Sequence, residues 1–380
     1  MMEEKNGMQV LVTGARGFVG RNLCVALRRL PDLRLFEYDV DSRPQDLDEA
    51  LKTADIVFHL AGVNRPQNVE DYQTGNTDFT AEICDKLQQW GCAPRIVMSS
   101  SIQAELDNPY GVSKRLAEES LKRFAADTGA QCVVYRLKNL FGKWCRPNYN
   151  SVTATFCYNA AHGLPLQISD RKNVVELTYI DDVVQAFVNE IEQAFQPGFR
   201  MALPLASRAI TLGELADIIK GFAAHRDTLR LPDYNDPFMR ALYATYLSYL
   251  DRDDFAYNLD IKADNRGSLA ELIKAPCFGQ IFVSRTKPGI TRGNHYHHTK
   301  TEKFMVVQGE GIIRLRQING DDVIEYVARG EDYRVVDIPP GYTHSIENTG
   351  NNEMVTLFWS SEVFDPEHTD TYFEPVLSSE

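Results

Sequence analysis

The sequence lacks the features that mark secreted, membrane-bound and nucleic-acid-binding proteins. It has no C-x-x-C pair, and its seven cysteines are an odd, scattered set that fits reduced thiols better than a disulfide framework. The start, MMEEKNGMQV, has no basic segment or apolar core of a secretory signal, and no apolar run is long enough to cross a bilayer. The cysteines are Cys24, Cys84, Cys92, Cys132, Cys145, Cys157 and Cys277. A cytoplasmic location follows as an expectation.

Basic residues are also scarce relative to acidic ones. The chain has 40 lysines and arginines against 53 acidic residues, for a net charge of -13. Nucleic acid and anionic membranes would repel such a surface, so neither is expected as the main partner. The charge does not exclude an anionic small molecule in a basic pocket.

The length of the chain predicts more than one domain. Its 380 residues, 43% of them hydrophobic, exceed the usual size of a single hydrophobic core. A change in pattern falls near residue 245, after an aromatic segment between Leu231 and Tyr257 that reads as a connecting helix with its aromatic face buried. We therefore expect one domain over residues 1–245 and another over residues 246–380.

The first domain opens with a strand that runs into a glycine-rich turn, MQVLVTGARGFVG. Gly14 suits a tight turn after the strand, and Gly17 allows the backbone to approach a pyrophosphate. That pyrophosphate would lie at the N-terminus of a helix beginning near Phe18. The segment predicts a dinucleotide-binding site.

Strand-like and helical segments alternate after this turn, which predicts a doubly wound parallel sheet with helices on both faces, a Rossmann-type α/β fold. Ligands of such sheets bind at the carboxyl ends of the strands, and the short motifs of the chain fall at those ends. The candidate cofactor-binding residues are Gly14, Arg16, Gly17, Phe18, Val19, Gly20, Leu60, Ala61, Gly62, Tyr110 and Lys114.

A candidate catalytic set lies in the segment SSSIQAELDNPYGVSK. Tyr110 and Lys114 share one face of a predicted helix, where the ammonium can lower the pKa of the phenol towards the working pH. Such a phenol can exchange a proton with an oxygen whose carbon exchanges hydride with nicotinamide. Ser101 would hold that oxygen, although Ser100 remains an alternative.

These motifs together, TGARGFVG, HLAG, SSS, Y-x-x-x-K and NLFG, resemble the extended short-chain dehydrogenase/reductases that act on nucleotide sugars. The resemblance covers residues 8 to about 240 and implies a nicotinamide cofactor and a nucleotide-sugar substrate. Asn76 and Asn139 are candidate substrate contacts, with turn or capping roles as the alternative.

The choice of cofactor rests on three residues near the second strand. Arg16 could pair with a 2'-phosphate, assisted by Arg43, which favours NADPH. Asp39 could instead bind a free ribose hydroxyl, which favours NADH. The two arginines make NADPH the expectation.

The second domain changes to short strands broken by turn signals, which predicts an antiparallel barrel or sandwich. In the segment GITRGNHYHHTKTEKFMVVQG, His295 and His297 lie two apart on a strand and point to one side. Glu302 and His344 complete a possible set of four metal ligands for Zn, Fe, Mn or Ni. His298 is a further candidate ligand or base, and Lys303 is a further candidate base.

This segment resembles the cupin superfamily, whose second motif is similar to the run from Pro339 to Asn348. One departure is Tyr333, which stands where the motif has glycine. The fold expected for the whole chain is thus a Rossmann-type reductase followed by an all-β cupin barrel.

The combination resembles the two-domain capsular polysaccharide enzymes that make UDP-2-acetamido-2,6-dideoxy-L-talose. Segments such as HLAGVNRP, NLFGKWCRPNYNSVTATFCY and KPGITRGNHYHHTK carry this resemblance. It implies epimerisation at C3 in the cupin, NADPH-dependent reduction at C4 in the first domain, bound zinc and a homodimer. The alternatives are a reductase with a structural or dimerising cupin, and a sugar-nucleotide sensor without activity.

Overall fold

The computed structural model describes residues 7–260, 262–264, 267–269, 273, 279–362 and 367–377. Contacts divide the chain into two compact units, each of them discontinuous in sequence. Unit 1 comprises Met1–Leu140, Trp144–Ser151 and Val175–Ala209, and unit 2 comprises Phe141–Lys143, Val152–Val174 and Ile210–Glu380. The boundary at residue 245 divides the sequence rather than these packed units, and it stays a prediction.

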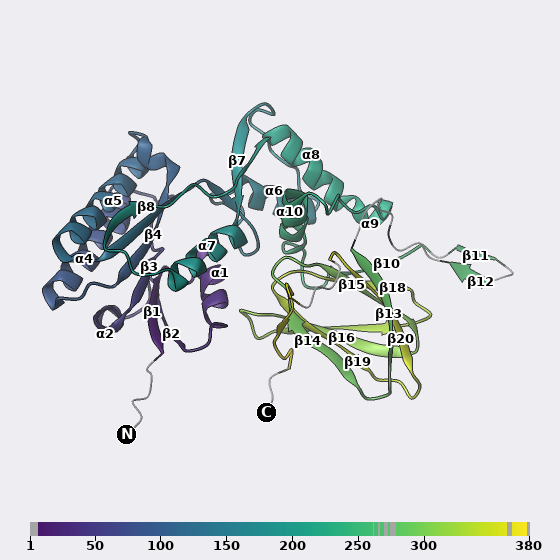
Figure 1. The fold of residues 1–380 in the computed structure, drawn as a ribbon. Coiled ribbons are helices and arrows are strands. Elements are labelled where there is room, and N and C mark those ends of the chain that lie inside the picture. The colour runs from purple at the N-terminus through teal and green to yellow at the C-terminus, as the bar shows by residue number, and fades with distance from the viewer. Residues whose placement is uncertain are drawn as a thin grey trace, which may run out of the picture. The chain divides into compact units, whose positions relative to one another are not determined.

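A six-stranded parallel sheet forms the centre of unit 1 (Figure 1), as predicted. Its order is β2-β1-β3-β4-β5-β8, so the chain steps from β1 to β2 on one side and then crosses to β3 on the other, where the strand order reverses. Such a reversal opens a crevice at the carboxyl ends of the strands, where ligands bind. The strands are β1 (Met8–Thr13), β2 (Leu33–Tyr38), β3 (Ile56–His59), β4 (Arg95–Ser101), β5 (Gln131–Leu137) and β8 (Gly198–Met201).

Helices cover both faces of this sheet because its strands are apolar on both sides. Val10 and Val12 of β1 pack with α1 and α7, whereas Leu11 packs with α2, α4 and α5 on the other face. The helices are α1 (Phe18–Leu27), α2 (Pro44–Thr53), α4 (Phe79–Trp90), α5 (Pro109–Thr128) and α7 (Ile180–Glu192). Among the described residues, no helix combines the length and apolar character needed to span a membrane.

Shorter elements lie between these. The helix α3 (Glu70–Tyr72) continues through a π-helical segment, η1 (Gln73–Asp78), into α4, and a 3₁₀ turn, η2 (Ile102–Glu105), follows β4. Segments of π-helix often mark functional sites. A separate three-stranded sheet contains β6 (Asn139–Phe141), β7 (Val174–Tyr179) and β9 (Arg208–Thr211).

Unit 2 contains helices as well as a barrel. The connecting helix predicted between Leu231 and Tyr257 is confirmed as α10, which Asp236 caps by accepting a hydrogen bond of 2.9 Å from the amide of Phe238. Its tyrosines Tyr243 and Tyr246 are buried, and Phe238 is half-buried. The helices are α6 (Val152–Ala161), α8 (Leu212–Ala223), α9 (His225–Thr228) and α10 (Pro237–Leu247).

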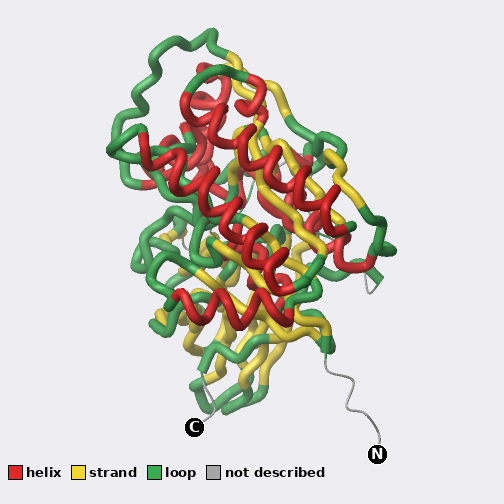
Figure 2. Tube along the Cα trace, turned by 90° about the vertical axis from the view of Figure 1, so that its left-hand side faces the viewer, coloured by secondary structure: helices red, strands yellow, loops and turns green. Residues whose placement is uncertain are grey.

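Two five-stranded antiparallel sheets form the cupin-like barrel, as predicted (strands in yellow in Figure 2). No helix occurs within residues 279–362 and 367–377. Their orders are β10-β18-β15-β20-β13 and β17-β16-β19-β14-β21, and β11 (Lys262–Asp264) pairs separately with β12 (Gly267–Leu269). The barrel strands are β10 (Ala256–Asn258), β13 (Gln280–Thr286), β14 (Thr291–Tyr296), β15 (Glu302–Gln308), β16 (Glu310–Gln317), β17 (Val323–Arg329), β18 (Arg334–Ile338), β19 (Tyr342–Asn348), β20 (Met354–Ser360) and β21 (Tyr372–Phe373).

Six of the seven cysteines are free thiols in the structure, in agreement with the absence of a disulfide framework. Cys277 lies outside the described residues.

Candidate functional site

Two glycines at the turn after β1 have no room for a side chain at their own positions. Gly14 has φ +67°, and a Cβ there would lie 2.7 Å from the amide nitrogen of Ala61, next to Leu60 and Gly62 in the loop after β3. A Cβ on Gly20 would lie 2.1 Å from the carbonyl oxygen of Gly14. Glycine is therefore required at both positions, and the bare turn meets the first turn of α1, which contains Phe18 and Val19.

The end of β2 brings together the residues that bear on cofactor choice. Asp39 Oδ2 accepts a hydrogen bond of 2.7 Å from the backbone amide of Arg16 in the glycine turn. The Arg16 side chain forms an ion pair with Asp41 and stays 59% exposed. Arg43 pairs with Asp46 at 2.6 Å and is 80% exposed. Ion pairs this exposed are weak, so both guanidinium groups can turn to another anion.

The catalytic candidates lie in the first turns of α5, whose start is fixed by Asn108 and Pro109. Asn108 Oδ1 accepts a hydrogen bond of 2.8 Å from the amide of Gly111. Four residues apart, Tyr110 and Lys114 then share one face. The Lys114 ammonium is buried and donates a hydrogen bond of 2.7 Å to the backbone oxygen of Ser99. This contact ties α5 to the carboxyl end of β4.

The electrostatics of this pair differ from the expectation. Burial raises the pKa of Tyr110, and a hydrogen-bonding interaction with the Ser101 side chain opposes the rise. Burial also lowers the pKa of Lys114 to about 8. Burial therefore dominates the pKa of both groups, and the Lys114 ammonium is held by its hydrogen bond to the Ser99 oxygen.

The two candidate serines point to opposite faces of β4. Ser100 is buried and donates a hydrogen bond of 2.5 Å to Glu118, which also binds Arg136 at 2.6 Å. Ser101, in contrast, interacts with Tyr110 and accepts a hydrogen bond of 3.1 Å from the amide of Gln103. Geometry therefore groups Ser101, rather than Ser100, with Tyr110 and Lys114.

Asn76 lies in the π-helical segment, and its amide holds the loop after β3. Its Oδ1 accepts from the Val63 amide at 2.9 Å, and its Nδ2 donates to the Val63 oxygen and the Ser113 hydroxyl, each at 3.0 Å. The side chain is buried. In this structure Asn76 thus supports the backbone between the glycine turn and α5.

A buried polar chain that the sequence reasoning missed continues from Asn76. His59 contacts the Thr13 hydroxyl through Nδ1 at 2.8 Å and the Thr80 hydroxyl through Nε2 at 2.9 Å, while Thr80 donates to the Asn76 oxygen. Burial, followed by the charge of Lys114, lowers the pKa of His59 to about 3, so this imidazole is neutral. The only signal in the sequence was the position of HLAG after a strand.

Asn139, the other candidate substrate contact, lies in β6 with an exposed side chain. Its Nδ2 donates a hydrogen bond of 3.3 Å to the backbone oxygen of Glu176 in β7. This contact leaves the Oδ1 atom for another donor.

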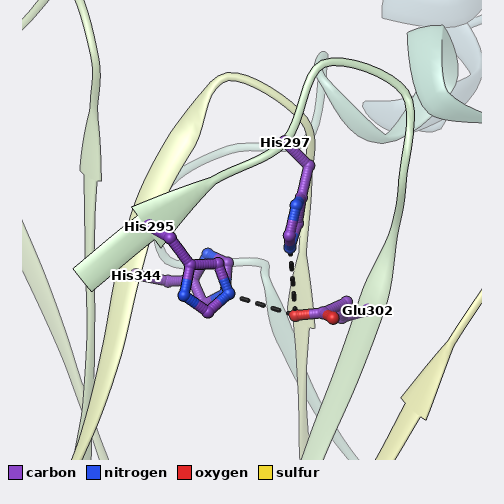
Figure 3. Close-up of side chains that lie close together, drawn as sticks. All are labelled: His295, His297, Glu302 and His344. Carbon is purple, nitrogen blue, oxygen red and sulfur yellow. Dashed lines mark ion pairs between the residues drawn. The ribbon is translucent and has the colours of Figure 1, made fainter. Parts of the chain in front are cut away.

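The barrel brings together the four predicted metal ligands. The nearest nitrogen or oxygen atoms of His295, His297, Glu302 and His344 all lie within 4.8 Å of one another. Figure 3 shows the three imidazoles converging on the carboxylate, with Nε2 of His297 and of His344 at 3.3 Å and 3.2 Å from Glu302 Oε2. Within the described part of the chain, this is the group of histidine, cysteine and acidic side chains with metal-binding geometry.

A β-bulge places the first of these ligands. Register between β14 and β19 shifts between Gly293 and His295, and His295 pairs with His344. Gly293 has φ +101°, and a Cβ there would lie 2.7 Å from the His344 oxygen.

Tyr333, where the family motif has glycine, adopts φ +49°, so the backbone keeps the left-handed conformation that favours glycine.

The donor set fits a divalent metal ion. Nε2 of His297 and Nε2 of His344 are buried and, within the described residues, make no hydrogen bond. The other nitrogen of His297 contacts the Asp370 oxygen at 2.5 Å, which makes Nδ1 the donor and leaves a lone pair on Nε2. Burial acts against the charge on Glu302, but the facing imidazoles hold its pKa well below the usual range. Nitrogen and carboxylate ligands of this kind suit zinc and other transition metals.

Asp370, just before β21, binds the loop that follows His297. The Asp370 carboxylate accepts hydrogen bonds from the amides of His298 at 2.9 Å, Thr299 at 2.7 Å and Lys300 at 2.7 Å. Burial opposes ionisation of Asp370, but these amides lower its pKa. The loop that follows His297 is thereby fixed.

The two additional candidates from the sequence lie away from the four-ligand group. The His298 ring packs against Tyr296 and Tyr372, with ring centroids 5.5 Å and 5.1 Å away. Lys303 faces the opposite side of β15 from Glu302 and forms a buried ion pair with Asp337. The suggestion of Lys303 as a base at this site is therefore wrong, because adjacent residues of a strand point to opposite faces.

Comparison with known proteins matches each half of the chain to a family. Residues 10–198 match the NAD dependent epimerase/dehydratase family, and residues 262–372 match the polysaccharide biosynthesis C-terminal domain. Neither match covers residues 199–261, which include the boundary predicted at residue 245.

Similarity to individual proteins extends over both halves. The chain is 41% identical to the UDP-2-acetamido-2,6-beta-L-arabino-hexul-4-ose reductase of Pseudomonas aeruginosa, over 96% of this chain and 98% of that protein. A crystal structure of the capsular polysaccharide assembling protein CapF from Staphylococcus aureus matches with a TM-score of 0.66 and 46% identity, covering 97% of this chain and 100% of that one.

A more distant match concerns the fold alone. The UDP-glucuronic acid 4-epimerase of Bacillus cereus, solved with NAD, has 19% identity and a TM-score of 0.51 over 57% of this chain and 85% of that one. The chain belongs to the family of two-domain polysaccharide enzymes that includes the Pseudomonas reductase and the Staphylococcus CapF protein.

Proposed function

We propose that this protein converts a UDP-linked 4-keto-6-deoxy-N-acetylhexosamine into UDP-2-acetamido-2,6-dideoxy-L-talose in two steps, for capsular or O-antigen polysaccharide. The first step inverts C3 in the barrel, and the second reduces the C4 ketone in unit 1 with NADPH. The keto sugar in the name of the 41% identical Pseudomonas reductase supports this substrate class. The Ser101, Tyr110 and Lys114 group carries the proposal, because its chemistry suits carbonyl reduction.

The order of the steps follows from the chemistry of the ketone. A carbonyl at C4 makes the hydrogen at C3 acidic, since loss of that proton leaves an enolate. Return of a proton on the opposite face inverts C3. Reduction at C4 removes the carbonyl, so C3 must be inverted first.

Unit 1 would carry out the reduction. The bound nicotinamide supplies a hydride to C4. Tyr110 donates its phenolic proton to the C4 oxygen, and the Ser101 hydroxyl holds that oxygen. Lys114, buried against β4, places a positive charge beside the phenol as it loses its proton. Asn139 contacts the nucleotide sugar. Asn76 fixes the loop after β3, on which the nucleotide sugar lies.

The preference for NADPH rests on the exposed guanidinium groups of Arg16 and Arg43 at the end of β2. A 2'-phosphate would exchange a weak carboxylate pairing for a charge-assisted one. Asp39 does not oppose this, because its Oδ2 already accepts the amide of Arg16.

The barrel would carry out the epimerisation. His295, His297, Glu302 and His344 would hold the metal, and zinc is the ion we propose. A bound divalent ion supplies positive charge that stabilises the oxygen of a developing enolate. The residue that moves the C3 proton is unassigned.

A second candidate is a reductase whose barrel binds metal for stability or forms a homodimer. Four protein ligands in one group favour it, since structural zinc sites are typically closed by four ligands. We propose a homodimer and a cytoplasmic location in either case.

Paired variants separate the two candidates. Tyr110→Phe should stop NADPH oxidation and leave deuterium exchange at C3 in D₂O intact. His295→Ala should stop deuterium exchange at C3 and still oxidise NADPH when the 3-epimer is supplied as substrate. Exchange that persists in a folded His295→Ala protein excludes metal-dependent epimerisation and favours the second candidate. Normal NADPH oxidation by Tyr110→Phe refutes the reductase assignment.

A further inference from the structure

Glu302 lies between Thr301, which contacts the loop before α10, and Lys303, which contacts the strands β10 and β18. Thr301 and Lys303 alternate with Glu302 and therefore face away from the imidazoles. The Thr301 hydroxyl is 3.2 Å from the hydroxyl of Tyr234, and both groups are buried. Lys303 forms a buried ion pair with Asp337 and donates a hydrogen bond of 3.1 Å to the Tyr257 hydroxyl.

The ion pair of Lys303 is part of a larger chain of polar contacts. Lys303 and Asp337 are register partners in β15 and β18, and their side chains are 2% and 1% exposed. Arg226 of α9 reaches the second oxygen of Asp337 at 3.4 Å and pairs with Asp254 at 2.7 Å. The Arg226 guanidinium and the Lys303 ammonium also lie over the ring of Tyr257, 5.1 Å and 5.2 Å from its centre.

Stability alone does not account for this arrangement. Moving two charges into a protein interior costs free energy that their attraction barely repays, and an apolar pair of similar volume is often as stable. A hydrogen-bonded ion pair adds a fixed geometry, because here it holds β15, β18 and α9 in one relative position. The strand held here begins with the metal ligand Glu302.

We propose that Tyr234 and Lys303 are positioning residues, which act through Glu302 and make residues 225–257 part of the support of the metal site. The inference rests on the proposed metal site in the barrel. Partners behind metal ligands set the orientation of those ligands, and their removal typically weakens metal binding about 10- to 100-fold. Glu302 needs such support because a small shift of β15 moves its carboxylate away from two imidazoles at once.

The test uses the full-length chain loaded with Co²⁺, whose visible absorption reports the ligands around the ion. The variants Tyr234→Phe and Lys303→Met should each bind Co²⁺ about tenfold more weakly or worse. Their spectra should move towards that of Glu302→Gln. Tyr246→Phe is the matched control, since it removes the hydroxyl of a buried α10 tyrosine that makes no hydrogen bond to β15 within the described residues, and it should leave affinity and spectrum unchanged.

A companion variant guards against misfolding. If Lys303→Met fails to fold because Asp337 keeps only its longer contact with Arg226, Lys303→Met with Asp337→Leu removes both charges of the pair and should fold. It should still bind Co²⁺ more weakly than the unaltered chain. If Tyr234→Phe and the double variant both keep the Co²⁺ affinity and the spectrum of the unaltered chain, the inference is overturned while the metal site stands. An unaltered chain that binds no Co²⁺, or Glu302→Gln that binds it equally well, overturns the metal site and the inference together.

Discussion

The ammonium of Lys114 donates a hydrogen bond of 2.7 Å to the backbone oxygen of Ser99, in a site where burial lowers the lysine pKa to about 8. The charge that the reductase needs is therefore lost near physiological pH rather than near 10.5, the ordinary value for lysine.

NADPH-dependent reduction should fall as the pH rises through about 8, because neutral Lys114 no longer favours the phenolate of Tyr110. Initial rates measured across this range test the expectation. Deuterium exchange at C3 without NADPH is the internal control, since Lys114 has no part in it, and it should lack this decline. A reduction rate that stays flat through pH 8 contradicts the role given to Lys114.

Removal of the two neighbouring serines should have different consequences. Ser101→Ala should lower turnover roughly 10- to 100-fold, because its hydroxyl holds the reacting oxygen. Ser100→Ala should cost about 1–3 kcal/mol of unfolding free energy through Glu118 and leave turnover nearly unchanged. Steady-state rates and thermal denaturation of both variants separate the effects. Reversed results would assign the catalytic serine to Ser100.

Two glycine substitutions compare a crowded position with an open one. Gly20→Ala should abolish cofactor binding, since its Cβ would overlap the Gly14 oxygen at 2.1 Å. Gly221→Ala, in α8 with no atom within 4 Å of the added carbon, should stabilise the protein by up to about 1 kcal/mol. Fluorescence titration with NADPH and thermal denaturation provide the readouts. Gly20→Ala that binds NADPH normally would remove the glycine turn from the cofactor site.

Two histidine substitutions delimit the metal site. His344→Ala should reduce bound metal and slow exchange at C3, because its Nε2 faces Glu302 in a buried position. His298→Ala should retain the metal, since its ring packs between two tyrosines outside the four-ligand group. Elemental analysis of the purified proteins gives the metal content. Loss of metal in His298→Ala would make it a fifth ligand.

The sequence predicted the elements whose signals are local. The glycine turn, the strand before it and the helix at Phe18 depend on neighbouring residues, and all three occur as expected. The spacing of the four candidate barrel ligands predicted their grouping, and strand alternation placed His295 and His297 on one side. The strand that carries His344 was not among the strands predicted for this domain, because YTHSIEN lacks apolar alternation.

The remaining features depend on packing that a single sequence does not reveal. Both faces of β4 are covered by helices, so alternation could not tell Ser100 from Ser101. The direction of Lys114 depends on how α5 docks against β4. Phe141–Lys143 and Val152–Val174 join unit 2 through contacts with distant residues, which no local pattern records.

The most direct test of the central claim is proton NMR of UDP-2-acetamido-2,6-dideoxy-L-arabino-4-hexulose incubated with the protein in D₂O, first without NADPH and then with it. The account predicts deuterium at C3 before NADPH is added, followed by NADPH oxidation and a product reduced at C4. Oxidation of NADPH without prior deuterium at C3 would contradict it, and would leave a sugar-nucleotide reductase whose barrel serves another purpose.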